Sequence, residues 1–105
     1  MTFFENLIDK ISYHYVDISD YKEIKKIIIS NDIEICFHLA AQVDVNVAKM
    51  NPHQTFESNI RGTYNVLEAL RLSKTIKSII VASSDKAYGE YKLKDLPYSE
   101  DYDLR

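Results

Sequence analysis

A short polar cluster that directly follows an apolar run is the part of this chain best suited to chemistry. The run Ile79–Val81 is typical of a strand buried on both faces of a parallel sheet, and Ser83-Ser84-Asp85-Lys86 comes after it. In open α/β sheets, ligands bind beyond the carboxyl ends of the strands. An adjacent acid and base suit a reaction that gives a proton at one atom and takes one at the next, such as loss of water from neighbouring carbons. The alternative is a polar turn that leaves a core strand.

Two other predicted strand ends carry residues suited to a nucleotide. Asp17, followed by Ile18, ends the strand predicted over Ile11–Val16, where its carboxylate can accept hydrogen bonds from an adenine amino group or a ribose hydroxyl. Helix capping is the alternative for Asp17. His38-Leu39-Ala40-Ala41-Gln42 ends a second strand, and its two alanines allow a backbone to come close to a bulky ligand. Its histidine is either a proton carrier or, as is more usual at a strand end, hydrogen-bonded in place.

The elements that position these residues follow from periodicity and turn signals. Residues 1–10 are helical or irregular, and a helix begins after Asp20, which has Glu23 three residues later as in a capping box, and runs to Ser30. Gly62 lies inside the longest predicted helix, where it indicates either close packing or a tolerated glycine. The other predicted elements are strands over Ile33–Leu39 and Ser78–Ser83, helices over Val43–Met50 and Thr55–Ser73, and a turn-rich segment over Ser84–Arg105.

The order of these elements defines the fold class. Strand, helix, strand, helix, strand with long crossovers predicts an α/β protein with a parallel sheet and right-handed connections. In the long helix we expect one apolar face, formed by Phe56, Ile60, Thr63, Leu67 and Leu70.

Bulk properties narrow the class of partner. The chain has 105 residues, so it forms at most one domain, and its net charge of −3 argues against nucleic acid or an anionic membrane as the main partner. A single cysteine, Cys36, and the lack of a signal segment or a long apolar run favour a cytoplasmic, soluble protein. The histidines and Cys36 show no metal-ligand spacing, so no metal site is predicted.

Several short motifs, in order and spacing, resemble the extended short-chain dehydrogenase/reductase superfamily, which includes the NAD-dependent sugar-nucleotide epimerases and dehydratases. Within it the chain most resembles the 4,6-dehydratases of the CDP-glucose type, through Asp85-Lys86 and Phe3-Phe4-Glu5. The matching residues are Asp17-Ile18, His38–Gln42, Asn51-Pro52, Phe56, Asn59, Gly62-Thr63, Asn65, Leu67–Ala69 and Ser83–Gly89.

The resemblance implies roles for these residues. Asp17 and Ile18 would border the adenine of NAD, and Ser58 would touch the cofactor from the long helix. Leu39, Ala40, Ala41 and Gln42 would line the ribose and nicotinamide side. Catalytic roles fall to three residues. Ser84 would hydrogen-bond the sugar hydroxyl that is oxidised, Asp85 would be the acid for the departing water, and Lys86 would stand where other dehydratases keep a glutamate base.

Two parts of the family pattern lie outside this sequence. The glycine-rich turn for the pyrophosphate would precede Met1, and the Tyr-x-x-x-Lys pair would follow Arg105. Tyr21/Lys25 and Tyr88/Lys92 have the latter spacing, but both pairs are rejected. The first lies in the first predicted helix, behind the wrong strand, and the second directly follows the third strand, with Gly89 disfavouring a helix between its two residues. We therefore expect the central fragment of a longer enzyme: a partial Rossmann-like, doubly wound sheet of three strands that lacks the first two. The first strand would then be separated from the second by a gap of roughly 9–10 Å.

Three functions stay open on the sequence. The first is part of an NAD-dependent sugar-nucleotide 4,6-dehydratase, which removes a hydride at C4, eliminates water across C5 and C6, and returns the hydride to C6. The second is a 4-epimerase, which has no need of an acid–base pair at Asp85-Lys86. The third is a non-catalytic nucleotide-binding module. The partner would be a nucleotide sugar, NADP is an alternative to NAD, and the intact enzyme is expected to be a homodimer.

Overall fold

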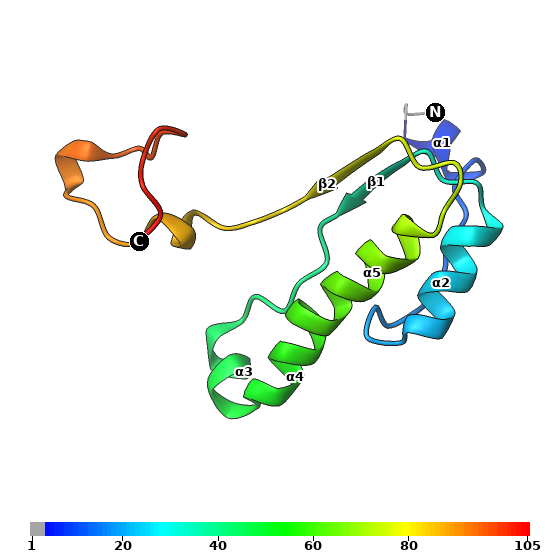
Figure 1. The fold of residues 1–105 in the computed structure, drawn as a ribbon, viewed down its shortest axis with the longest axis horizontal. Helices are drawn as coiled ribbons and strands as arrows, with labels where there is room; N and C mark the ends of the chain where they lie inside the picture. Colours follow the sequence, from blue (N-terminus) through cyan, green and yellow to red (C-terminus); the bar gives the residue numbers. More distant parts are fainter. Residues whose placement is uncertain (1–3) are drawn as a thin grey trace.

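The computed structural model describes residues 4–105, so Phe3 of the Phe3-Phe4-Glu5 motif lies outside the described part. Helices α2 and α5 lie side by side against one face of a small sheet, and the chain then leads away to a separate C-terminal segment (Figure 1). The elements are α1 (Glu5–Ile8), α2 (Tyr21–Ser30), β1 (Ile35–His38), α3 (Val45–Met50), α4 (Pro52–Phe56), a π-helix (Glu57–Arg61), α5 (Gly62–Arg71), β2 (Ser78–Val81) and 3₁₀ turns (Asp85–Tyr88, Leu93–Asp95).

The sheet confirms the predicted α/β class. β1 and β2 pair in parallel, with Ile35 opposite Ser78 and His38 opposite Val81. The connection between them runs through α3, α4 and α5, as a parallel pair requires. The backbone N–H of Ala82 donates to the carbonyl of His38 at 3.0 Å, so the pairing continues to the point where both strands end.

The strand predicted over Ile11–Val16 is wrong. Those residues are irregular, and within the described chain their backbone makes no ladder with another segment. Exposure does not alternate along the segment, because residues 11–15 are all exposed and only Val16 packs against the core. A strand is defined by a hydrogen-bonding neighbour, and although α2 lies beside this segment, no described segment pairs with its backbone.

The helix boundaries follow their caps. Asp20 accepts a hydrogen bond from the backbone N–H of Glu23 at 3.2 Å and begins α2 as predicted. Asn51 ends α3 and begins α4, because its side chain accepts from the N–H of Gln54 while Pro52 occupies the first turn. The predicted long helix forms with one irregularity, the π-helix between α4 and α5.

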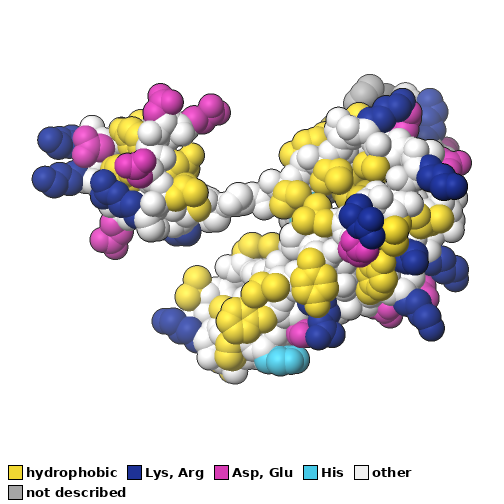
Figure 2. All heavy atoms as spheres, viewed as in Figure 1, with side chains coloured by type: hydrophobic (Ala, Val, Ile, Leu, Met, Phe, Trp, Pro, Cys, Tyr) yellow, Lys and Arg dark blue, Asp and Glu magenta, His cyan; other side chains and the backbone are white. Residues whose placement is uncertain are grey.

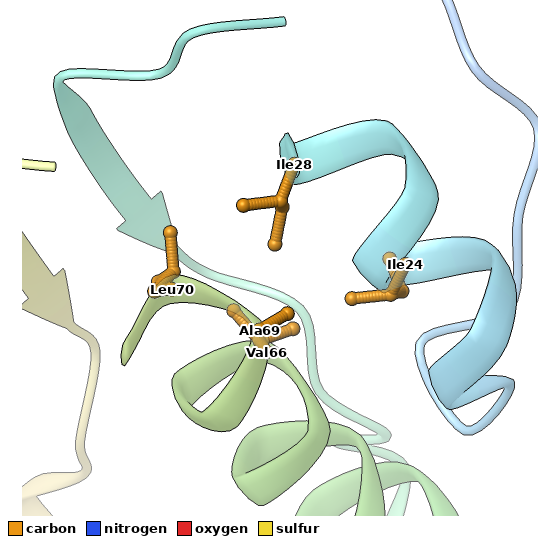
Figure 3. Close-up of a cluster of buried hydrophobic side chains, with 5 residues drawn as sticks. All are labelled: Ile24, Ile28, Val66, Ala69 and Leu70. Carbon is orange, nitrogen blue, oxygen red and sulfur yellow. The ribbon is translucent and has the colours of Figure 1, made fainter. Parts of the chain in front are cut away.

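The core lies between α2 and α5. Ile24 and Ile28 of α2 point toward Val66, Ala69 and Leu70 of α5 (Figure 3), and these five side chains are the buried apolar residues of the described chain. Around them pack partly buried apolar residues: Val16, Ile18, Tyr21, Ile33, Cys36 and Ile76.

The apolar face predicted for the long helix is wrong in part. Of the predicted residues only Leu70 lies in the core, whereas Phe56 and Ile60 are more than half exposed. The helix carries two apolar stripes, and α2 covers the one that runs through Val66, Ala69 and Leu70. Figure 2 shows hydrophobic side chains gathered on its visible face over the sheet and the long helix.

The strand β2 is not buried on both faces. Ile79, Ile80 and Val81 are 41%, 42% and 44% exposed, and Phe37 of β1 is 66% exposed. Helices cover one face of this two-stranded sheet, and no described element covers the other (Figure 1). The β-branched composition therefore predicted the strand correctly, but the predicted burial on both faces is wrong.

Residues 85–105 form a C-terminal lobe beyond β2, joined to the rest by a narrow connection (Figure 2). Tyrosines hold it together: Tyr88 stacks on Tyr98 at 5.2 Å, and Tyr91 stacks on Tyr102 at 4.8 Å between ring centroids. The guanidinium of Arg105 lies 3.9 Å from the centroid of the Tyr91 ring. The predicted turn character of this segment is confirmed, with two 3₁₀ turns and no longer element.

Candidate functional site

A cleft of about 480 Å³ opens at the carboxyl ends of β1 and β2. It brings together two clusters that lie more than 40 residues apart in the chain, Ala40-Ala41-Gln42 and Ser83-Ser84. This is the edge where ligands bind in open α/β sheets. The residues that line it are His38, Ala40, Ala41, Gln42, Val43, Asn59, Thr63, Ala82, Ser83 and Ser84.

Small side chains border the cleft at both strand ends. Ala40 and Ala41 follow β1, and Ala82 follows β2, so the walls here carry no bulky group. The hydrogen bond from Ala82 N–H to the His38 carbonyl keeps the two strand ends together. A flat or ring-shaped ligand can therefore approach the backbone closely at this edge.

His38 is held in place by a hydrogen bond. It is 6% exposed, and its Nε2 lies 3.0 Å from Oγ1 of Thr63. The Thr63 hydroxyl donates its single proton to the carbonyl of Asn59 at 2.7 Å, so it accepts from His38, whose Nε2 carries the proton. Of the two alternatives for His38, the structure shows the fixed, hydrogen-bonded histidine.

Gln42 organises the loop after β1. Its backbone N–H donates to Oδ1 of Asn59 at 2.7 Å, and its carbonyl accepts from Nδ2 of Asn59 at 3.0 Å. Its side-chain amide donates to Thr55 Oγ1 and to the carbonyl of Asp44, both at 3.0 Å. The side chain of Gln42 is thus bonded both to the loop and to α4, and the residue borders the cleft from a fixed position.

Asn59 and Thr63 line the cleft, although their residue types gave no role in the sequence. A signal was present: polar Thr63 sits on an otherwise apolar helix face, and polar His38 ends an apolar strand. Buried polar side chains need hydrogen-bond partners, and His38 and Thr63 are hydrogen-bonded to each other.

Of the three predicted catalytic residues, only Ser84 lies in the cleft. Ser84 lines the cleft, and its Oγ accepts from the backbone N–H of Lys86 at 3.2 Å, which begins the 3₁₀ turn Asp85–Tyr88. Asp85 and Lys86 are exposed on this turn and do not line the cleft. The structure therefore brings one of the three catalytic candidates to the strand ends and leaves the acid and the base just outside.

The other predicted cofactor residues lie away from the cleft lining. Asp17 accepts from the backbone N–H of Ser19 at 2.9 Å and from its hydroxyl at 2.8 Å. These bonds, the backbone one first, lower the pKa of the Asp17 carboxyl. Ile18 packs against Gly62 of α5, Leu39 is 68% exposed, and Ser58 is half-buried on the π-helix.

The two rejected Tyr-x-x-x-Lys pairs have other surroundings. The ammonium of Lys25 lies over the Tyr21 ring at 5.9 Å, on α2. Tyr88 stacks on Tyr98 in the C-terminal lobe and does not border the cleft. Among residues 4–105, no three His, Cys, Asp or Glu side chains are arranged to hold a metal ion, and no helix there has the length and apolar character to cross a membrane.

The parallel pair, its helical crossover and the cleft at the strand ends define a Rossmann-like α/β protein. The GDP-mannose 4,6 dehydratase family matches residues 4–105, and the chain belongs to this family. The resemblance to sugar-nucleotide epimerases and dehydratases is thereby confirmed.

Individual relatives include both kinds of enzyme. CDP-paratose 2-epimerase of Salmonella typhi is 37% identical over 84 residues, which are 80% of this chain and 24% of the relative. CDP-glucose 4,6-dehydratase of Salmonella typhimurium is 34% identical over 82 residues, 78% of this chain and 23% of the relative. The chain thus spans about a quarter of these relatives.

A solved structure shows the same fold. The UDP-glucose 4-epimerase of Stenotrophomonas maltophila, solved with bound NAD and formylated UDP-arabinopyranose, matches with a TM-score of 0.73 and 26% identity. The match covers 86% of this chain and 26% of the epimerase. The sheet and crossover described above are therefore shared with a sugar-nucleotide enzyme.

Proposed function

We propose that this chain, as a partial dinucleotide-binding domain, supplies the nicotinamide- and sugar-facing part of an NAD-dependent sugar-nucleotide 4,6-dehydratase. The observation that carries the proposal is the cleft, where Ala40-Ala41-Gln42 and Ser84 line one space at the strand ends. Membership of a dehydratase family and a relative that dehydrates CDP-glucose support it.

Residues of this chain fit the nicotinamide side of NAD. Small side chains at Ala40 and Ala41 leave room for a ring system, with Leu39, Gln42 and Ser58 next to them in sequence or on the facing helix. Asp17 and Ile18 would border the adenine.

No glycine-rich turn that could cradle the pyrophosphate of NAD lies in this sequence. Of its two glycines, Gly62 packs against Ile18 and Gly89 against Arg105, and neither lines the cleft. The chemistry that NAD, or NADP in its place, would supply when bound is the acceptance and return of a hydride.

The residues after β2 act on the sugar. Ser84 donates a hydrogen bond to the sugar hydroxyl that is oxidised at C4. Asp85 gives a proton to the hydroxyl that leaves from C6, and Lys86 takes the proton from C5, which completes the elimination of water. Their exposed position on a short turn beside the cleft suits a sugar that extends outward from the nicotinamide side.

A 4-epimerase is the second candidate, and two observations favour it. A relative with 32% identity is a UDP-glucose 4-epimerase, and Asp85 and Lys86 do not line the cleft. An epimerase inverts a centre without loss of water, so it needs Ser84 but neither member of the acid–base pair.

Product analysis separates the two enzymes. The matched segment of the Salmonella typhimurium CDP-glucose 4,6-dehydratase is replaced by this chain, and the product is identified by mass spectrometry. Loss of the dehydrated product in Asp85→Asn, with activity kept in the matched surface variant Asp101→Asn, supports the dehydratase. Unchanged turnover in Asp85→Asn refutes an acid role. Thermal unfolding of each chimera shows whether a silent variant is folded.

Calorimetric titration of the 105-residue chain with NAD tests the non-catalytic module. The dehydratase proposal predicts almost no heat, because the phosphate cradle is not part of this chain, whereas a self-sufficient nucleotide-binding module predicts saturable binding. The expected homodimer stays a prediction that sedimentation can measure.

A further inference from the structure

The loop between β1 and α3 is fastened to the long helix by one side chain. Asn59 makes two reciprocal hydrogen bonds to the backbone of Gln42, accepting its N–H at 2.7 Å and donating to its carbonyl at 3.0 Å. A carboxamide that pairs with both groups of one residue copies the bonds that a neighbouring strand would make. The loop residue that borders the cleft thus gains a strand-like partner after the sheet has ended.

The π-helix places Asn59 for this contact. The N–H of Gly62 donates to the carbonyl of Glu57, five residues earlier, instead of four as in an α-helix. One extra residue in a turn rotates the preceding helix by about 100° relative to the following one. Asn59 can therefore face the loop while Val66 and Leu70, farther along, face α2.

A second contact joins the same turn to the sheet. The Thr63 hydroxyl donates to the Asn59 carbonyl at 2.7 Å and lies 3.0 Å from Nε2 of His38, at the end of β1. The turn is thus bonded to β1 at His38 and to the following loop at Gln42. Between these two points lie Leu39, Ala40 and Ala41.

We propose that Asn59 is a positioning residue for the cofactor half of the cleft, a role that rests on the proposed function. Through its two bonds to Gln42, Asn59 holds the backbone of Ala40 and Ala41 at the distance from Ser83 and Ser84 that the cleft requires. It acts through the loop and does not itself perform chemistry. The bond between Thr63 and His38 fixes the other end of the same segment.

Backbone amide exchange of the full 105-residue chain tests this role. In ¹⁵N-labelled protein, Asn59→Ala should speed exchange of the Gln42 amide about fivefold or more, because a hydrogen bond of ordinary strength is lost. The Leu70 amide in the core should keep its rate. Asn59→Asp keeps an acceptor for the Gln42 N–H, so the Gln42 amide should exchange more slowly in this variant than in Asn59→Ala. The control is Asn46→Ala, an exposed asparagine on α3 whose side chain makes no hydrogen bond to any residue in 4–105.

Two results would overturn the proposal. One is an unchanged Gln42 rate in Asn59→Ala, and the other is an equal speed-up at Leu70, which would mean a general structural role. A proton on Nδ1 of His38 in the wild-type spectrum would overturn the contribution of Thr63.

Addition of millimolar NAD separates this proposal from the proposed function. Shifts of the Ala40 and Ala41 amides that occur in wild type and disappear in Asn59→Ala support the role of Asn59 and favour a self-sufficient nucleotide-binding module over the dehydratase proposal. An absence of shifts in wild type is what the dehydratase proposal expects of this chain, and the exchange rates then decide the role of Asn59.

Discussion

Gly62 lies in direct contact with the side chain of Ile18. A Cβ atom on Gly62 would stand 2.5 Å from Cγ1 of Ile18, so close that a side chain at this position would force Ile18 to move. The contact joins the first turn of α5 to the segment after Val16. Of the two meanings that a glycine inside the predicted helix can have, close packing is therefore the one that the structure supports.

Gly62→Ala should destabilise the chain by about 1–3 kcal/mol, because the added methyl overlaps Ile18 in a packed contact. At an open helix position the same change would stabilise by about 0.4–1 kcal/mol. Urea denaturation measures the free energy of unfolding and so decides the sign. Ile18→Ala in the Gly62→Ala background should recover part of the loss, and a purely additive double mutant would contradict the contact.

Asn65 fastens the same segment by hydrogen bonds. Its Nδ2, on a side chain that is 4% exposed, donates to the carbonyls of Ile18 and Ser19 at 2.9 and 3.0 Å. Asn65→Leu should cost roughly 1–3 kcal/mol, because these carbonyls lose their partner. Thermal unfolding beside the exposed control Asn46→Ala measures the loss, and equal melting temperatures for the two variants would show that the bonds contribute nothing.

Burial raises the pKa of the Cys36 thiol above its ordinary value of 9.0. The neutral thiol is the form that the fold favours, so this contribution to stability is present below pH 9.0 and is lost as the pH rises through the folded-state pKa. At pH 8 the folded chain should react with a disulfide reagent several-fold more slowly than the chain in urea. Equal rates in the two conditions would show that the thiol is not protected.

The contribution of the Asp17 carboxyl to stability depends on pH in the opposite direction to that of Cys36. Its pKa in the folded chain lies below its ordinary value of 3.8, so its contribution is present above that pH and is lost as the pH falls through the folded-state pKa. Because Asp17 is exposed, the effect is small, well under about 1 kcal/mol. In Asp17→Asn, the free energy of unfolding should fall only slightly less steeply as the pH is lowered than in wild type. A large difference between the two would mean that Asp17 has a partner other than Ser19.

The chain by itself should be marginally stable and prone to associate. Its buried apolar residues are confined to the space between α2 and α5, while Phe37, Ile80 and Phe56 are all more than 40% exposed. We expect a broad thermal transition that depends on protein concentration, measured by circular dichroism with light scattering. A sharp transition of a monomer, unchanged on dilution, would contradict this expectation.

Local signals predicted much of the fold. The Asp20 cap, the apolar period of α2 and the break at Asn51-Pro52 act within a few residues, and each appears where the sequence indicates it. Ile11–Val16 shows the limit of such reasoning, because its pattern suits a strand but pairing requires a neighbour that no local pattern can supply. The same limit holds for the candidate site. The predicted strand ends indicated that Ala40-Ala41 and Ser84 lie at the cleft, but the contact of Asn59 with Gln42 depends on the π-helix, which no local pattern predicts.

The sequence by itself determined the α/β class, the family and the strand ends at which the cleft opens, because composition, periodicity and motif order are properties of the chain. Only the tertiary structure decided which stripe of the long helix is buried, which glycine is packed and which polar side chains hold the loop after β1. These depend on contacts between residues far apart in sequence, such as Ile18 with Gly62 and Gln42 with Asn59, whose geometry exists only once α5 lies against the sheet and α2.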